Sequence, residues 1–481
     1  MEGAVPFVST ESPVCAALDG WPEYSRLPSP GAIDVQAAGM NHVYRESGCS
    51  SARASAVRQI VRGNGFTMRA SRCLSRVCAV IAGMFMAGGL WWPGCAVAAP
   101  GVSTAGTRHE EVPDAYVYPA SGSADQADEL QRVLDGLRPG QRLVFAPGRY
   151  VVGRSLIVRR PHVVLSGYGA TLTATRPGDQ TIEMRGDGTT LVGFRLKGTG
   201  TTRLASREST KVEVTGHDVQ VLDNVVEGGA SAGIFVFGGS DVAIVGNEVL
   251  STLADGIHMT HGARDVLVQG NVVRDTGDDM IAVVSYRGDG VLSRNVLITR
   301  NSLEGNTWGR GITVVGGADV TISNNIVRNV QVSAGILVAQ EDSFQTYGAS
   351  GVRIENNVIA NIQTATGRTD PRPLTQQGAI EVSTWSGAVT QVAVVGNRVS
   401  QARFDGIRLW GNVSGVRLAD NQLSGIGGMP VRVGPKHDCV VDSPTSGPCA
   451  MTLQSRSVAP DVVGADTSLL PRVRELVGQP R

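Results

Sequence analysis

The chain has 481 residues, of which 61 are glycine and 5% are aromatic, and its formal net charge at neutral pH is zero. This balance excludes the basic footprint of a nucleic-acid-binding protein, so we expect no nucleic acid among its partners. Residues 1–67 are rich in Ser, Ala and Gly and show no hydrophobic periodicity. We expect them to be an unstructured extension, or a misassigned start if Met68 is the true initiator.

Residues 68–98 have the pattern of a secretory signal peptide. Three arginines precede an apolar run over residues 77–92, and Ala96 and Ala98 supply the small residues that a signal peptidase reads. We therefore expect cleavage after Ala98 and a periplasmic or secreted protein. The apolar run is short for a membrane span, so no stable membrane insertion is expected after cleavage. The alternative to a start at Met68 is a genuine extension on a membrane-anchored protein.

The mature chain is expected to begin with an extended lead-in over residues 99–122. Residues 123–138 then have Ser and Asp at the start, apolar residues at helical spacing and Pro-Gly behind them, which predicts a short capping helix. The repeats described next extend the domain over residues 123–434. Residues 435–481 form a tail, in which Cys439 and Cys449 flank a Pro/Ser/Gly loop and are expected to form a disulfide.

A nine-residue phrase recurs along the C-terminal two-thirds of the chain. It reads small-or-Asp, apolar, any, apolar, two residues, Asn, any, apolar, and successive copies lie 23 to 40 residues apart. Such a period with loops of unequal length is typical of a solenoid. A turn asparagine tolerates left-handed backbone and can stack amide on amide, so we interpret the repeated asparagines as a structural ladder. They are Asn224, Asn247, Asn271, Asn301, Asn325, Asn357, Asn397 and Asn421.

Each repeat contains a second phrase, Gly-Ile-any-apolar, as in GIHM at Gly256 and GITV at Gly311. Both phrases alternate apolar with variable residues, which is the period of a strand. Short β-branched strands separated by Gly and Asn turns indicate a parallel β-helix, with one row of side chains inside and the next facing solvent.

A short helix, a Pro-Gly-Arg-Tyr strand at Pro147 and a Gly-punctuated series of coils resemble the pectin lyase-like superfamily. The resemblance covers nearly all of the mature chain. It implies an all-β fold, a right-handed parallel β-helix that forms a single-stranded solenoid of about ten or eleven coils with an N-terminal capping helix. It does not imply one activity, because that superfamily includes hydrolases, lyases, epimerases, phage tailspikes and adhesins.

The Gly-Ile phrases align candidate chemical residues on neighbouring coils. Two places before the interior Ile stand Asp255, Asp279 and Arg310, with Asp278 beside Asp279. Coils stack about 4.8 Å apart, so these side chains should form one column. Closely spaced carboxylates cannot all ionise easily, so one can act as a general acid while another is a base.

These residues also resemble the polygalacturonases of glycoside hydrolase family 28. DGIHM at Asp255 is similar to that family's Asn-Thr-Asp-Gly-Ile-His segment, and GDDMI at Gly277 to its Gly-Asp-Asp-Cys-Ile segment. The resemblance implies inverting hydrolysis, with Asp279 or Asp278 as the general acid and Asp255 with the remaining aspartate activating water. The sequence departs from the family at Leu253-Ala254 and at Gly309-Arg310-Gly311, where the family has Asn-Thr and Gly-His-Gly.

Further residues are candidates for binding a polysaccharide. Arg310 is expected to contact a negative charge of the substrate, which favours an acidic polymer. The outward row after each interior Ile adds a His, a Glu and an Arg, and exposed Trp faces suit the apolar face of a sugar ring. No metal or other cofactor is expected. The remaining candidates are His258, Tyr286, Arg287, Trp308, Glu381 and Arg408.

Three functions are compatible with these residues. The leading hypothesis is an exported glycoside hydrolase. A polysaccharide lyase or uronate epimerase would need a base for the sugar C5 proton and a cation for the carboxylate, which Arg310 with His258 or Tyr286 could supply. The third is a non-catalytic solenoid that binds a polysaccharide in the periplasm or at the cell surface.

Overall fold

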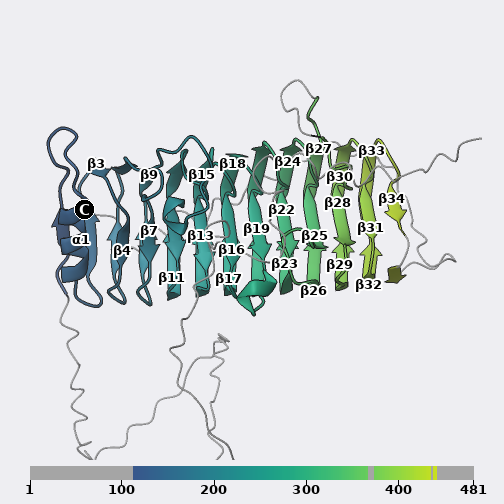
Figure 1. Ribbon diagram of the computed structural model, residues 1–481, viewed down its shortest axis with the longest axis horizontal. Coiled ribbons are helices and arrows are strands. Elements are labelled where there is room, and N and C mark those ends of the chain that lie inside the picture. Colours follow the sequence, from purple (N-terminus) through teal and green to yellow (C-terminus); the bar gives the residue numbers. More distant parts are fainter. Residues whose placement is uncertain (1–111, 367–372, 435–436, 441–481) are drawn as a thin grey trace, which may run out of the picture. The chain divides into compact units, whose positions relative to one another are not determined.

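The computed structural model describes residues 112–366, 373–434 and 437–440. Its strands form three parallel sheets, which the chain visits in turn so that each coil adds one strand to each sheet (Figure 1). Connections between parallel strands of one sheet are right-handed almost without exception. The expected fold, an all-β right-handed parallel β-helix, is therefore confirmed.

Sheet 1 has 13 strands and runs from the N-terminal to the C-terminal coil. Its strands are β1 (Ala115–Val117), β2 (Arg142–Phe145), β5 (Val164–Ser166), β8 (Thr190–Val192), β11 (His217–Leu222), β14 (Ser240–Val245), β17 (Arg264–Gln269), β20 (Arg294–Thr299), β23 (Gly317–Ser323), β26 (Ala349–Glu355), β29 (Val389–Val395), β32 (Val413–Ala419) and β35 (His437–Val440). Eight of its strands, from β11 to β32, carry the first part of the recurrent phrase, and the Asn follows each of them.

Sheets 2 and 3 have 11 strands each. The strands of sheet 2 are β3 (Gly148–Val152), β6 (Ala170–Ala174), β9 (Arg195–Lys197), β12 (Val225–Glu227), β15 (Glu248–Leu250), β18 (Val272–Thr276), β21 (Ser302–Asn306), β24 (Ile326–Val330), β27 (Val358–Ile362), β30 (Arg398–Ala402) and β33 (Gln422–Ile426). The strands of sheet 3 are β4 (Leu156–Val158), β7 (Ile182–Met184), β10 (Val212–Val214), β13 (Ile234–Phe237), β16 (Ile257–Thr260), β19 (Ile281–Val284), β22 (Ile312–Val315), β25 (Ile336–Gln340), β28 (Ile380–Thr384), β31 (Ile407–Trp410) and β34 (Val431–Val433).

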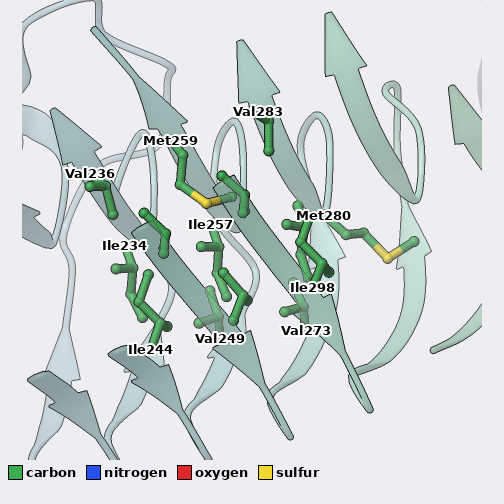
Figure 2. Close-up of a cluster of buried hydrophobic side chains, with 14 of the residues drawn as sticks. Ile234, Val236, Ile244, Val249, Ile257, Met259, Val273, Met280, Val283 and Ile298 are labelled. Atoms are coloured by element: carbon green, nitrogen blue, oxygen red, sulfur yellow. The ribbon is translucent and has the colours of Figure 1, made fainter. Parts of the chain in front are cut away.

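The core is a set of apolar columns along the inside of the coils. Ile257, Ile281 and Ile312 are paired from strand to strand in sheet 3, and each is fully buried. Figure 2 shows how such side chains from successive coils fill the interior. The Gly-Ile phrase thus marks the first residue of each middle strand of sheet 3, as its strand period predicted.

The outward row of sheet 3 is less exposed than the alternation predicted. His258, Thr313, Leu337 and Glu381 are all buried. The physical reason is that long connections lie over this face. The loop between β9 and β10 reaches Asp278 through Arg203, and the connection after β25 reaches Arg310 through Glu341.

The predicted asparagine ladder is present in the structure. From Asn224 to Asn397, each side-chain amide donates a hydrogen bond to the side-chain oxygen Oδ1 of the ladder Asn in the next coil, over distances of 2.9–3.1 Å. One part of the interpretation was wrong. None of the eight ladder asparagines, all of which lie in described coils, has a positive φ. The left-handed position is the residue before each Asn, such as Asp223 or Gly246, because the chain bends there.

A single short helix covers the N-terminal end of the solenoid. Helix α1 (Ala127–Gly136) packs on β4 and buries Leu130 and Leu134. Its Gln131 side chain donates to the carbonyl oxygen of Ile157 and accepts the amide of the same residue, both at 2.9 Å. The edge strand of sheet 3 therefore has backbone groups satisfied by the helix, which is how a cap prevents edge pairing. The expected capping helix is confirmed.

Several expectations fall outside this description. The N-terminal extension, the signal peptide of residues 68–98 and the Ala98 cleavage site lie outside the described residues, as do Cys449 and the side chain of Cys439. Among the residues that the structure describes, no helix has the length and apolarity needed to cross a membrane.

Candidate active site

Three aspartates meet in the turns that lead into two neighbouring strands of sheet 3. Asp255 precedes β16, and Asp278 and Asp279 precede β19. Because β16 and β19 are paired in register, the two turns stack on each other. One carboxylate oxygen of each aspartate lies within 4.8 Å of the corresponding oxygen of the other two. We call these three residues the acidic triad.

Backbone hydrogen bonds hold the triad from coil to coil. The amide of Asp279 donates to Asp255 Oδ1 at 3.0 Å, and the amide of Arg310 donates to Asp279 Oδ1 at 2.6 Å. Gly309 lies directly against the second turn, where an added β-carbon would overlap the amide nitrogen of Asp279 and come within 2.5 Å of Asp278 Oδ1. The close approach of this backbone to the triad therefore requires glycine.

His258 is a partner of the triad. Its Nδ1 lies 2.6 Å from Asp255 Oδ2, and its ring packs 5.2 Å from that of Phe235 between centroids. Its side chain is only 8% exposed. His258 was predicted to contact substrate. In the structure His258 is buried and its Nδ1 contacts the carboxylate of Asp255, so it can orient that carboxylate.

Arg203 also belongs to the site, and no sequence motif pointed to it. It lies in the loop between β9 and β10, and its Nη1 is 2.6 Å from Asp278 Oδ2. No repeat position marks this loop, because connections of this kind vary in length from coil to coil. A single Arg in such a loop has no sequence signal that relates it to an aspartate 75 residues later.

The three carboxyl groups differ in how easily they ionise. Burial raises the pKa of Asp279 well above its ordinary value; Arg310 opposes this shift, whereas the charges of Asp278 and Asp255 add to it. Burial and the charge of Asp255 also raise the pKa of Asp278, against the opposing effect of Arg203. For Asp255, burial is outweighed by His258 and Arg203, which bring the pKa below its ordinary value. Asp255 therefore loses its proton first and Asp279 holds its proton longest.

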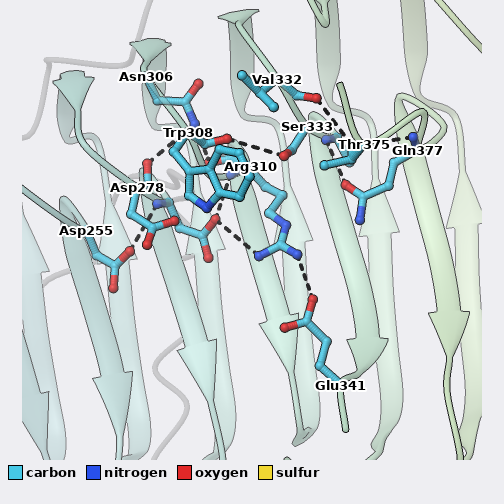
Figure 3. A network of polar contacts seen from close by, with 12 residues as sticks. Asp255, Asp278, Asn306, Trp308, Arg310, Val332, Ser333, Glu341, Thr375 and Gln377 are labelled. Atoms are coloured by element: carbon cyan, nitrogen blue, oxygen red, sulfur yellow. Dashed lines mark hydrogen bonds and ion pairs between the residues drawn. The ribbon is translucent and has the colours of Figure 1, made fainter. Parts of the chain in front are cut away.

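Arg310 lies in the predicted column but has a different partner from the one expected. Its Nη2 is 2.6 Å from Glu341 Oε1, and its Nη1 is 4.0 Å from Asp279 Oδ1. Figure 3 shows its side chain crossing the face of sheet 3 between the triad and Glu341. Glu341, which the sequence did not single out, therefore takes the ion pair that was assigned to the substrate.

Two further predicted residues lie in the connection after β19. Tyr286 is half-buried, and burial followed by the negative charges of Asp255 and Asp278 raises the pKa of its hydroxyl. Arg287 is exposed and donates from its backbone amide to the carbonyl of Gln345 at 2.8 Å and from Nε to that of Thr346 at 3.0 Å. Tyr286 is thus close enough for the charges of the triad to affect its pKa. Arg287 connects its own loop by hydrogen bonds to the connection after β25.

The other predicted residues divide between the triad and more distant coils. Trp308 is half-buried beside Gly309, and its carbonyl accepts a hydrogen bond from Ser333 Oγ (Figure 3). Glu381 and Arg408 lie three and four strands beyond β19, or about 14–19 Å along the solenoid. They form a bidentate ion pair of 2.8–3.0 Å in which Glu381 is fully buried. The structure therefore does not bring this pair to the triad.

The triad has the donor chemistry of a cation site, since carboxylate oxygens are the ligands that hard divalent ions prefer. One oxygen from each of Asp255, Asp278 and Asp279 could face a single ion. Two arginine side chains already supply positive charge at this position, because Arg203 and Arg310 both lower the pKa of Asp278. The geometry therefore suits a bound divalent ion and, equally, a metal-free triad whose three carboxyl groups are in different protonation states.

The sequence matches the model of the right-handed β-helix region over residues 182–327 and 282–423. The chain belongs to the right-handed β-helix family. No curated protein matches it.

Solved structures of right-handed β-helix proteins resemble this one. The catalytic domain of a GH87 α-1,3-glucanase in complex with tetrasaccharides is 18% identical over 68% of each chain, with a TM-score of 0.53. The A-module of the Azotobacter vinelandii mannuronan C-5 epimerase AlgE4 is 17% identical over 67% of this chain and 97% of its own, with a TM-score of 0.51. The Dettilon tailspike protein is 13% identical over 66% of this chain and 68% of its own, with a TM-score of 0.50. At these identities the likeness establishes the fold alone.

Structures of that glucanase carry aspartate-to-alanine substitutions at three positions. The three substituted positions are 23 residues apart and then adjacent. In this chain Asp255 and Asp278 are also 23 residues apart, and Asp279 follows directly.

Proposed function

We propose that this protein is an exported enzyme that hydrolyses glycosidic bonds of a polysaccharide with the acidic triad. The observation that carries the proposal is the convergence of Asp255, Asp278 and Asp279 within 4.8 Å, with the pKa of Asp255 lowered and that of Asp279 raised. Glycoside hydrolysis needs one protonated and one ionised carboxyl group at the same bond, and this arrangement supplies both.

The roles follow from the order of ionisation. Asp279 keeps its proton and is the general acid that protonates the leaving oxygen. Asp255, oriented by His258, is ionised and accepts a proton from water. Asp278, paired with Arg203, is the second acceptor. The same three residues therefore provide one acid and two bases.

The spacing of the triad supports attack by water. A water molecule that donates both hydrogens through bonds of about 2.8 Å places its two acceptors about 4.5 Å apart. The oxygens of Asp255 and Asp278 lie within this range. Direct attack by such a water would invert the anomeric carbon, but the three carboxylates lie closer than the roughly 6.5–9.5 Å that separates acid and base in most inverting enzymes, so the anomer of the first product decides between inversion and retention.

The matching spacing of the substituted aspartates in the glucanase complexes gives independent support. Those complexes contain oligosaccharides, and the alanine substitutions fall at three aspartates with the spacing of this triad. This favours a sugar polymer as substrate. The acidic polymer expected from Arg310 has less support, because Arg310 pairs with Glu341.

A lyase or epimerase is the second candidate, and the AlgE4 epimerase module has the same fold. Its chemistry needs a base for the C5 proton. Tyr286 would have to ionise, but burial and the neighbouring carboxylates raise the pKa of its hydroxyl. His258 is buried against Asp255. These contacts favour the hydrolase.

Incubation of the protein from residue 99 onward with α-1,3-glucan, polygalacturonate and alginate tests the proposal. Hydrolysis gives products that are one water heavier than lyase products and have no ultraviolet absorbance, and proton NMR of the first product gives the anomer. We expect Asp279→Asn to lower kcat by about 10²–10⁴-fold. Asp405→Asn is the matched control, because Asp405 occupies the equivalent turn before β31.

Three results would contradict the proposal. Unsaturated products would assign the protein to the lyases. Binding of a polymer without turnover, by the protein with an intact triad, would favour the non-catalytic solenoid. Normal turnover by Asp279→Asn would remove the triad from the mechanism.

A further inference from the structure

Arg203 approaches the triad from a different part of the chain. It lies in the loop of residues 198–206, between β9 and the short 3₁₀ helix η2 (Arg207–Ser209). Its guanidinium is 2.6 Å from Asp278. The Arg203 side chain is 52% exposed, whereas that of Asp278 is 14% exposed. The loop therefore brings a charge from the surface onto a carboxylate that the β-helix buries.

Several contacts fix the loop that carries Arg203. The amide of Leu204 donates to Ser231 Oγ at 2.8 Å, and that of Gly200 donates to the carbonyl of Gly229 at 2.7 Å. Arg207 forms an ion pair with Glu213, and its guanidinium lies 4.0 Å from the ring centroid of Phe237. Anchors on both sides of Arg203 reduce the entropy that its ion pair with Asp278 must overcome.

The groups that face Asp278 come from every neighbouring element. Asp255 comes from the preceding coil, with His258 hydrogen-bonded behind it. Asp279 shares the turn of Asp278. Tyr286 follows in the next connection, and Arg310 comes from the next coil. Arg310 forms an ion pair with Glu341, whereas Arg203 forms one with Asp278 itself.

The charge of Arg203 acts on two members of the triad. It opposes the effect of burial on the pKa of both Asp278 and Asp255. Asp279 instead lies beside Arg310, and burial dominates its pKa. Arg203 therefore acts on Asp255 and Asp278, whereas Arg310 acts on Asp279 and less strongly on Asp278.

We propose that Arg203 is a positioning residue that keeps Asp278 ionised and oriented, so that the proton of the triad is held by Asp279. The proposal rests on the proposed hydrolytic function and adds a residue to it. Without Arg203, Asp278 and Asp279 are two buried carboxyl groups on one turn that compete for a proton, and the division between acid and base is lost.

The first test measures the triad directly and needs no substrate. The protein from residue 99 onward is labelled with ¹³C at aspartate carboxyl carbons, and the Asp278 signal is identified by its loss in Asp278→Asn. In Arg203→Met we expect the Asp278 titration to move to higher pH by one unit or more, because the opposing cation is gone. In Arg203→Lys, which keeps the positive charge, the Asp278 titration should return most of the way to that of the parent protein. Arg195→Met, which removes a surface pair with Glu227, should leave the titration unchanged.

The second test uses the pH dependence of kcat/KM on the polymer that the protein cleaves. The acid limb of this profile reports the bases of the free enzyme, so in Arg203→Met the limb should move to higher pH. The variant should then regain part of its activity as the pH is raised. At the acid end we expect a loss of about 10- to 100-fold relative to the parent enzyme. A structural role alone would lower activity equally at all pH values.

These tests separate the two proposals. An unchanged Asp278 titration in a folded Arg203→Met protein, judged by an unaltered circular dichroism spectrum, overturns the role of Arg203 even if the enzyme hydrolyses a polysaccharide. A shifted titration in a protein that cleaves no polymer supports the control of Asp278 by Arg203 and counts against hydrolysis.

Discussion

Two turns of this β-helix have the same backbone design and different chemistry. In the triad, Asp279 accepts the amide of Arg310 at 2.6 Å, and Gly309 presses against it. Near the C-terminal end, Asp405 precedes β31 and accepts the amide of Met429 at 2.8 Å, and an added β-carbon on Gly428 would come within 2.5 Å of its Oδ1. An aspartate at this position is therefore a structural device of the turn, whatever else it does.

The difference lies in the charges around the two aspartates. Asp405 has a cation of its own, since Arg432 Nε lies 2.5 Å from its Oδ2. Burial opposes ionisation of Asp405, but Arg432 and the Met429 amide outweigh it and lower its pKa. Asp279 shares its surroundings with two other carboxylates, and its pKa is raised. The chemistry therefore arises from converging carboxylates, not from the turn itself.

The largest expected effect comes from filling the space next to the triad. In Gly309→Ala, the new methyl group overlaps Asp279 and must displace the triad, because the atoms nearest to it belong to the Asp279 backbone and to the carboxylates of Asp278 and Asp279. We expect kcat to fall by about 100-fold or more, since small misplacements of reacting groups are costly. Kinetics on the cleaved polymer measure this.

Gly428→Ala is the matched control, because it crowds Asp405 in the same way. We expect both variants to unfold at lower temperature, but only Gly309→Ala to lose activity per folded molecule. Equal losses of activity in the two variants would show that the turns are not functionally different.

Replacing the turn aspartate by Asn should change the free energy of unfolding at neutral pH in opposite directions in the two turns. The folded pKa of Asp279 is above its ordinary value, so its contribution to stability is present at low pH and lost as pH rises through the folded pKa. Asp279→Asn should therefore raise the free energy of unfolding at neutral pH, by about 1 kcal/mol or more, and change it little at pH 3.

For Asp405 the folded pKa is below its ordinary value, so its stability contribution is present at neutral pH and lost as pH falls through the folded pKa. Asp405→Asn should lower the free energy of unfolding by about 1–2 kcal/mol at pH 7, because Arg432 loses its partner. Urea unfolding of both variants at pH 3 and pH 7 measures these differences. Shifts of the same sign at pH 7 would contradict the comparison.

The sequence predicted the features that recur in register. The Asn ladder, the interior Ile columns and the capping helix each depend on local patterns or on a fixed step from coil to coil, so counting residues was sufficient. The same counting placed Asp255 and Asp279 on adjacent turns. It could not show that Asp405 has the same backbone role, because that role is visible only in the hydrogen bonds.

The partners of the triad were not predictable in this way. Arg203 and Glu341 lie in connections whose lengths differ between coils, and the path of such a connection is not given by the repeat. For this reason Glu341 was not foreseen as the ion-pair partner of Arg310. The outward row was taken as exposed for the same reason, since these connections cover it.

The smallest expected effect comes from removing Arg432, the cation that pairs with Asp405. Arg432 has a side chain that is 43% exposed, so its ion pair with Asp405 is partly screened by solvent. Arg432→Met should therefore lower the free energy of unfolding by only about 0.5–1 kcal/mol and leave kcat/KM and its pH profile unchanged. Arg203→Met removes a side chain of similar exposure, 52%, but is expected to shift the pH profile. Denaturant unfolding and pH–rate profiles of Arg432→Met and Arg203→Met, measured side by side, test both expectations. A shifted profile in Arg432→Met would mean that charge in the C-terminal coils reaches the triad, and that the two turns are not electrostatically separate.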